Sequence, residues 1–256
     1  MQARSEQIMH ELLRSGRVSV DELSIKLRVS GVSVRRDLRR LEDEGLLRRE
    51  RGGAVPLGPL LYEALGHDSS FQEQIERRAE EKRRIGLAAA ELVRDGDTIA
   101  LAAGTTTTYI ARALHRRENV TVLTNSVNIA MELSGRHGVT VQLSGGVLRG
   151  GWFSLAGASA LETIQSVFPD ICFLSINGID ARRGFTDYHA EEAAVNRALL
   201  RQSRRKVVVA DHSKFGIIAT RAVCAIEEIN IVITDTGATD EMIGPLMKKG
   251  IEVRRV

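Results

Sequence analysis

Four arginines gather in one short segment of the chain, at Arg35, Arg36, Arg39 and Arg40. Apolar Val34, Leu38 and Leu41 recur there at the spacing of one helix face, which predicts a helix whose arginines lie off its core side. A guanidinium group binds phosphate and can donate two hydrogen bonds to guanine. The segment therefore has the chemistry of a helix that reads double-stranded DNA.

The two ends of this helix are expected to contact DNA differently. Residues at the N-terminal end of a recognition helix usually meet base edges, which selects Gly31, Ser33, Arg35 and Arg36, with Ser30 placed to cap the helix. Phosphate contacts, which position a protein without reading sequence, are expected from the later basic residues Arg39, Arg40, Arg48, Arg49 and Arg51.

A structural alternative exists for these arginines, namely that they are solvated or paired with nearby carboxylates. For Arg40 and Glu44, which have helical spacing, this alternative carries equal weight. Asp37 is assigned a structural role, because a carboxylate that faced phosphate would be repelled.

The surrounding elements resemble a small DNA-binding module. Helices are predicted over about 5–15 and 19–27, the second with capping-box spacing between Ser19 and Glu22. After the third helix, which Gly45 is placed to end, residues 46–55 predict two short strands around a tight basic turn. Three helices followed by a basic hairpin are the order of a winged helix-turn-helix.

The charge distribution agrees with this assignment. Residues 1–56 contain 12 Lys and Arg against 9 Asp and Glu, whereas residues 57–256 contain 24 of each. The net excess of +3 therefore lies in the first fifth of the chain. A polyanionic partner is expected for that part alone, although a solvated basic surface would give the same numbers.

A second candidate site begins at Gly104, Thr105, Thr106 and Thr107, where an apolar strand runs into a Gly-Thr loop that opens a helix. Free backbone N–H groups, hydroxyls and the positive end of the helix dipole would form a phosphate cradle there. The alternative is that Thr105 or Thr106 only caps the helix.

Other predicted strands also end in small or polar residues. Because ligands of open α/β sheets bind at the carboxyl ends of the strands, these loops are expected to converge on one crevice. The candidate effector-binding residues at these ends are Asn125, Ser126, Gly145, Gly146, Asp180 and Lys214, and Glu191, at the start of a predicted helix, is a further candidate. Lys214 could neutralise a phosphate, or it could be an exposed surface lysine.

The remainder of the chain alternates apolar strands with helices. Strands are predicted over 98–102, 120–124, 140–143, 171–176, 206–210, 229–234 and 251–254, and helices over 82–93, 107–114, 127–133 and 191–200. This pattern predicts an α/β fold, with a winged helix-turn-helix domain followed by a larger, Rossmann-like domain around a mostly parallel sheet.

The predicted boundaries are a DNA-binding domain at 1–56, a linker and connecting helix at 57–79, and a sensing domain at 80–256. Cys172 and Cys224 fall in apolar runs, which favours a reducing compartment over a disulfide framework. With neither a signal peptide nor a membrane-spanning run predicted, a cytoplasmic location is expected. No cofactor or metal site is expected, since no His, Cys or carboxylate spacing is typical of one.

Specific residues resemble the DeoR family of bacterial regulators. Residues 29–38, 41–42, 45–49 and 52–54 are close to the family pattern V-S-x-x-T-[IV]-R-R-D-L followed by L-E-x-x-G-x-[IL]-x-R-x-H-G-G-A. Ser33 stands where Thr is usual, which keeps the hydroxyl, and Arg51 stands where His is usual, which adds charge.

The resemblance continues at 81–82, 96–99, 104–107, 124–126, 145–146, 184–186 and 210–216, which look like the DeoR effector domain. That domain is similar to ribose-5-phosphate isomerases, which implies a phosphorylated sugar or related effector and a homo-oligomer. Ala102 stands where the family commonly has Asp, which removes a possible partner for sugar hydroxyls.

The resulting interpretation is a transcriptional regulator, most simply a repressor, of a carbohydrate operon. The isomerase likeness raises the alternative of an enzyme with an added DNA-binding domain, for which Glu191 and Asp180 are the candidate carboxylates. Because the Lys that should neighbour the Glu is missing near Glu191, we expect binding without turnover.

Overall fold

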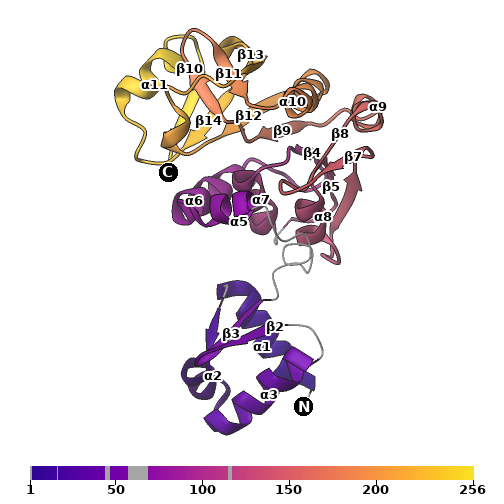
Figure 1. The fold of residues 1–256 in the computed structure, drawn as a ribbon, viewed down its shortest axis with the longest axis vertical. Coiled ribbons are helices and arrows are strands. Elements are labelled where there is room, and N and C mark those ends of the chain that lie inside the picture. The colour runs from indigo at the N-terminus through magenta and orange to yellow at the C-terminus, as the bar shows by residue number, and fades with distance from the viewer. Residues whose placement is uncertain (1, 16, 44–46, 57–68, 115–116) are drawn as a thin grey trace. The chain divides into compact units, whose positions relative to one another are not determined.

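The computed structural model describes residues 2–15, 17–43, 47–56, 69–114 and 117–256. The chain divides into two compact units, 1–64 and 65–256 (Figure 1). Each unit has its own buried apolar residues. Most of the predicted linker, 57–68, lies outside the described residues, as do Glu44 and Gly45. Within the described part of the chain, no helix has the length and apolar character needed to span a membrane.

The N-terminal unit has the element order of a winged helix-turn-helix. It consists of α1 (Gln2–Ser15), β1 (Val18–Ser19), α2 (Val20–Leu27), α3 (Gly31–Asp43), β2 (Leu47–Glu50) and β3 (Gly53–Pro56). The strands form an antiparallel sheet in the order β1-β3-β2. The core is formed by apolar residues of all three helices together with strand residues, and includes Ile8, Leu12, Leu23, Val34, Leu38, Leu41 and Leu47.

Local chemistry explains where these elements begin and end. Ser19 and Glu22 form the predicted capping box, in which each side chain accepts a backbone N–H of the other residue. Ser30 Oγ accepts the N–H of Ser33 at 3.3 Å, as expected for an N-cap of α3. Gly53 is needed at the start of β3, because a Cβ there would lie 2.0 Å from the carbonyl oxygen of Val18.

The larger unit is built around a seven-stranded sheet in which neighbouring strands run parallel, in the order β15-β14-β12-β9-β4-β5-β6. The strands are β4 (Thr98–Leu101), β5 (Val120–Thr124), β6 (Val139–Leu143), β9 (Ile171–Leu174), β12 (Arg205–Val209), β14 (Ile231–Thr234) and β15 (Glu252–Arg255). Each of them coincides with a strand that the sequence predicts, within two residues at either end.

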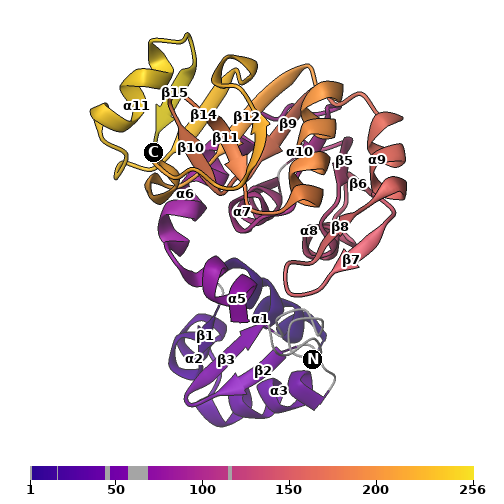
Figure 2. The same ribbon diagram turned by 45° about the horizontal axis from the view of Figure 1, so that its top comes forward.

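Helices cover both faces of this sheet (Figures 1 and 2). On one face lie α6 (Ala79–Ala90), α7 (Thr105–Ala113) and α8 (Val127–Leu133), and on the other lie α9 (Ala158–Gln165), α10 (Ala190–Gln202) and α11 (Asp240–Met247). Side chains alternate between the two faces along each strand. In β4, Ile99 and Leu101 pack on the side of α6, α7 and α8, whereas Ala100 packs on the side of α9, α10 and α11. This arrangement confirms the predicted doubly covered parallel sheet.

Smaller elements were not predicted. Beside the main sheet lie a hairpin of β7 (Val147–Arg149) and β8 (Ser154–Ala156), and an antiparallel sheet of β10 (Gly178–Asp180), β11 (Gly184–Asp187) and β13 (Arg221–Cys224). By contrast, the connecting helix that the sequence predicts within 57–79 is present as α5 (Ser69–Glu76), which precedes α6. Both cysteines, Cys172 and Cys224, are buried and free.

Candidate functional site

Helix α3 presents a basic surface. Its buried residues include Val34, Leu38 and Leu41, and its exposed arginines are Arg35, Arg36 and Arg39. The predicted separation of an apolar side from a basic side is therefore present. Val32, which the sequence pattern did not single out, is also 72% exposed at the second position of the helix.

Two polar side chains of α3 face α1 rather than solvent. Asp37 is 3% exposed, and its Oδ2 accepts a hydrogen bond from Arg4 Nε at 2.6 Å. This ion pair gives Asp37 the structural role that the sequence predicted. Arg40 is half-buried and donates a hydrogen bond to Ser5 Oγ, so the structural alternative fits Arg40 better than the predicted phosphate contact.

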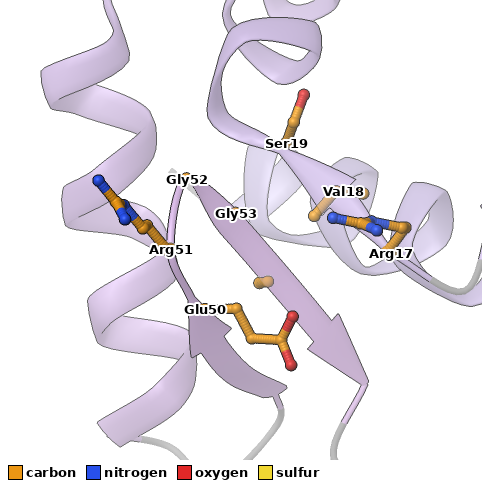
Figure 3. A pocket seen from close by; sticks show the side chains of 8 residues that line it. Arg17, Val18, Ser19, Glu50, Arg51, Gly52 and Gly53 are labelled. Atoms are coloured by element: carbon orange, nitrogen blue, oxygen red, sulfur yellow. The ribbon is translucent and has the colours of Figure 1, made fainter.

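The β2–β3 hairpin carries the other predicted phosphate contacts. Arg48 lies 3.5 Å from Glu50, and Arg49 lies 3.6 Å from Glu42, so both exposed arginines have a surface carboxylate nearby. Arg51 is exposed at the turn and points to the opposite side of the hairpin from Glu50 (Figure 3). Surface pairs of this kind are weak, and phosphate oxygens can replace the carboxylates.

A small hollow lies between this hairpin and β1 (Figure 3). It is lined by Arg17, Val18, Ser19 and residues 50–54, and its volume is about 90 Å³. Ligand pockets usually exceed about 300 Å³. The hollow therefore has the size of a groove within the fold rather than of a ligand site.

A larger cavity, here called the strand-end pocket, lies in the C-terminal unit and has a volume of about 390 Å³. Its lining comes from the α5–α6 region, from the loops that follow β4, β5, β9 and β12, from the end of β11, and from α10 and neighbouring loops. The lining residues are Gln74, Arg77, Arg78, Lys82, Ala103, Gly104, Thr105, Thr106, Asn125, Trp152, Ser175, Ile176, Asn177, Asp187, Tyr188, Glu192, Asn196, Asp211, Ser213, Lys214 and Ile217. Four adjacent strands of the parallel sheet thus end at one pocket, as predicted for an open α/β sheet.

The N-terminus of α7 opens onto this pocket. Gly104 is the N-cap and provides no side-chain cap, while the hydroxyls of Thr107 and Thr108 turn back to its carbonyl oxygen at 3.0 and 2.8 Å. A Cβ at Gly104 would lie 2.4 Å from Ser175 Cβ, so glycine lets the loop approach the end of β9. The capping alternative for Thr105 and Thr106 is therefore wrong, and the first N–H groups of α7 lack a side-chain cap.

Cationic side chains line the pocket close to the start of α6 and after β12. Lys82 is 3% exposed and donates hydrogen bonds to the carbonyl oxygens of Gln74 and Arg77, the latter at 2.7 Å. Burial lowers the pKa of Lys82 to about 8. Arg78 Nε lies 3.9 Å from Asp211, and Arg77 and Lys214 complete the group. Together with the α7 N-terminus they form an anion-binding environment.

Carboxylates line the same pocket. Asp187 is 2% exposed and accepts hydrogen bonds from the amides of Asn177 at 2.6 Å and Asn196 at 2.7 Å. Burial raises the pKa of Asp187 to about 7, and the nearby carboxylate of Glu192 adds to the rise. Glu192 itself accepts a hydrogen bond from Ser154 Oγ and lies 2.6 Å from Arg149.

The structure brings five of the predicted effector-binding residues together in the strand-end pocket: Gly104, Thr105, Thr106, Asn125 and Lys214. Asn125 also holds the pocket in shape, because its Oδ1 accepts the N–H of Ala103 at 2.8 Å and its Nδ2 donates to Leu155 O at 3.1 Å. The loops that follow the central strands β4, β5, β9 and β12 therefore meet at one pocket.

Six predicted residues do not line the pocket: Thr107, Ser126, Gly145, Gly146, Asp180 and Glu191. The hydroxyls of Thr107 and Ser126 are used in local hydrogen bonds, to Gly104 O and Asn128 Oδ1. The glycines lie where the chain leaves edge strand β6 for the β7–β8 hairpin, and a Cβ at Gly146 would lie 2.4 Å from Ala156 O.

Asp180 and Glu191 lie outside the pocket for separate reasons. Asp180 accepts the N–H groups of Arg182 and Arg183 in the β10–β11 turn, and these bonds lower its pKa. Glu191 is exposed in the first turn of α10, whereas the next residue, Glu192, faces the pocket. Among the described residues, no cluster of three His, Cys, Asp or Glu side chains could hold a metal ion.

Comparison with known proteins accounts for both units. Residues 4–57 match the family model of the DeoR-like helix-turn-helix domain, and residues 77–236 match that of the DeoR C terminal sensor domain. The second match alone covers more than half of the chain. The chain belongs to the DeoR family of transcriptional regulators.

Relatives of this DeoR-family regulator match it over nearly its whole length. It is 32% identical to the HTH-type transcriptional regulator GolR of Listeria innocua, over 98% of this chain and 97% of that protein. It is 33% identical to the putative aga operon transcriptional repressor of Escherichia coli O157:H7, over 98% and 92% of the two chains. The HTH-type transcriptional repressor GlcR of Bacillus subtilis is 32% identical, over 96% and 93%.

The DeoR sensor match spans every residue of the strand-end pocket except Gln74. Sequence reasoning missed the contribution of Arg77 and Arg78, which fall in the segment predicted as a connecting helix. The sequence signal that could have indicated them is a pair of consecutive arginines directly before a helix. It also missed Asp187, which ends a strand of four residues that carries no clear periodicity, and Asn196, which lies on the helix predicted over 191–200.

Proposed function

We propose that this DeoR-family regulator represses an operon for carbohydrate use and that a phosphorylated sugar in the strand-end pocket controls its affinity for DNA. The observation that carries the proposal is the open N-terminus of α7 in a pocket that Arg77, Arg78, Lys82 and Lys214 also line. Backbone N–H groups at a helix start, combined with cationic side chains, favour a phosphate ester.

The names of relatives support the same class of target. One relative is named a putative aga operon transcriptional repressor, and another, from Escherichia coli K12, is named the Glycerol-3-phosphate regulon repressor. A pocket of about 390 Å³ has room for a sugar phosphate, since small-molecule sites span roughly 300–1,000 Å³.

For the DNA side, the exposed face of α3 supports base contacts by Arg35 and Arg36 near the start of the helix. Arg39, Arg48, Arg49 and Arg51 supply phosphate contacts. Because a regulator of this kind acts on the chromosome, a cytoplasmic location belongs to the same proposal.

Control of DNA affinity requires that the effector bind two states of the protein unequally. We infer a homo-oligomer in which effector binding changes how two winged helices are presented to the half-sites of one operator. An effector that prefers the non-binding conformation then releases the protein from DNA.

The pocket is proposed to bind without catalysis. An isomerase needs a carboxylate that is free to move a proton between adjacent carbons, whereas Glu192 is held by Arg149 and Ser154, and both oxygens of Asp187 accept side-chain amides. Incubation with pentose and hexose phosphates, followed by analysis of the sugars, tests this: measurable isomerisation would establish the enzyme alternative.

The sensing proposal is tested by measuring operator affinity in the presence of a panel of sugar phosphates, on a duplex first selected from a random pool by the protein itself. At least one ester should lower the affinity, by about 5- to 150-fold for a typical coupling free energy. The variant Lys214→Ala should weaken the response to that ester without changing affinity for DNA alone. An operator affinity that no ester changes contradicts the proposal.

A further inference from the structure

Asp187 is the carboxylate of the strand-end pocket whose charge is least compensated. It ends β11 and is 2% exposed, and the neutral amides of Asn177 and Asn196 donate to its two oxygens. Within the described parts of the chain, no Lys or Arg forms an ion pair with it. Its pKa is accordingly raised by burial to about 7.

The other two carboxylates of the pocket differ in this respect. Glu192 lies 2.6 Å from Arg149 Nη1, and Asp211 lies 3.9 Å from Arg78 Nε. Each therefore has a cation nearby that offsets the cost of partial burial. Asp187 alone among the three relies on neutral hydrogen-bond donors.

The cations of the pocket show the opposite imbalance. Of the four that line it, Arg78 is the only one that the described residues pair with a carboxylate. Arg77, Lys82 and Lys214 add positive charge beside the α7 N-terminus, which is itself electropositive. One cavity thus combines an excess of positive charge with a separate, uncompensated negative group.

We propose that the effector is a phosphorylated amino sugar, whose phosphate binds at the α7 N-terminus and the neighbouring cations and whose ammonium group pairs with Asp187. An ionised carboxylate can accept about four hydrogen bonds, so the two side-chain amides leave room for an ammonium donor. A neutral hydroxyl could fill the same place, but it would not offset the burial that raises the pKa of this carboxyl, whereas an ammonium group favours the ionised form. This inference rests on the proposed function, because it presumes that a phosphate ester is the effector.

The test uses matched ligands and the full-length protein. Isothermal titration at neutral pH would compare glucosamine 6-phosphate with glucose 6-phosphate, galactosamine 6-phosphate with galactose 6-phosphate, and each amine with its N-acetylated form. One amine should bind at least about tenfold more tightly than its hydroxyl and N-acetyl counterparts, the size expected for one charge-assisted hydrogen bond.

Two variants separate Asp187 from general effects. Asp187→Asn should bring the affinity for the amine to that for the hydroxyl ester, while binding of the hydroxyl ester shows that the pocket is still folded. Asp180→Asn, which neutralises a carboxylate outside the pocket, should leave the preference unchanged.

The outcomes are distinct. Equal affinity of the wild-type protein for amines and hydroxyl esters, or a preference that persists in Asp187→Asn, overturns the amino-sugar inference and leaves the sugar-phosphate proposal standing. Failure of every phosphate ester to bind overturns both.

Discussion

Val32 is an unusual residue to find on the exposed side of a basic helix. It leaves 72% of its surface exposed at the second position of α3, beside the residues predicted to meet base edges. An aliphatic side chain in the major groove can contact the C5-methyl group of thymine. Such a contact would add apolar readout to the hydrogen bonds of Arg35 and Arg36.

Substitution of uracil for thymine deletes that methyl group and nothing else. Val32→Ala should lower operator affinity about fourfold, the equivalent of roughly one buried methylene group. At one thymine of the operator, uracil should weaken binding of the wild-type protein by a similar factor and leave binding of Val32→Ala unchanged. Binding assays on a series of single thymine-to-uracil duplexes provide the measurement.

The matched control is Ile25→Ala on α2, where the side chain is 80% exposed but lies on the helix that precedes the recognition helix. This variant should retain the full response to uracil. If the wild-type protein and Val32→Ala respond identically at every thymine, Val32 does not read a methyl group.

Residue-level prediction from the sequence was accurate where one strong interaction dominates. Asp37 was assigned a structural role from charge repulsion alone, and its buried carboxylate pairs with the partly exposed Arg4. The pocket carboxylates were predicted incorrectly: the sequence analysis selected Asp180 and Glu191, whereas Asp187 and Glu192 line the pocket. Which of two adjacent glutamates faces a pocket depends on helix rotation, and that is determined by tertiary packing.

At the level of elements, the five central strands β4, β5, β9, β12 and β14 were predictable because each consists mostly of apolar residues that are covered on both faces of the sheet. The strands β7, β8, β10, β11 and β13 contain three or four residues each, too few to show a period. Of these strands, β11 contributes Asp187 to the pocket, and the loops beside β7 and β10 contribute Trp152 and Asn177, so this side of the pocket was beyond sequence reasoning. The sequence did predict the loops at the carboxyl ends of the long strands, including the Gly-Thr loop before α7.

The position of α7 depends on the close approach of Gly104 to β9. Gly104→Ala would place a Cβ 2.4 Å from Ser175 Cβ, so the N-terminus of α7 must shift. We expect a decrease of about 1–3 kcal/mol in the free energy of unfolding, as for other overpacked sites, and weaker binding of phosphate esters. Denaturant unfolding and ester titration measure the two effects.

The double variant Gly104→Ala/Ser175→Gly tests the cause. Removing the side chain of Ser175 removes the atoms nearest to the new Cβ, so it should restore much of the stability. A double variant in which the two destabilisations simply add would show that the contact with Ser175 is not what requires glycine at this position.

At the scale of the whole molecule, the net positive charge lies in residues 1–56, and the structure shows which of those charges face outward. Arg39 and Arg51 are exposed on α3 and on the hairpin turn, whereas Arg40 is half-buried against Ser5 of α1. Removing one cation that neutralises a DNA phosphate should reduce the slope of log affinity against log salt concentration by about 0.9.

Arg39→Ala and Arg51→Ala should therefore weaken binding to all duplexes to a similar extent and flatten the salt dependence by about one unit each. Arg40→Ala is the matched control, since it removes the same charge from a side chain directed into the fold: we expect it to lower the stability of the N-terminal unit and to leave the slope unchanged. Equal changes of slope for all three variants would mean that DNA responds to the total charge of the unit rather than to the arginines that its fold exposes.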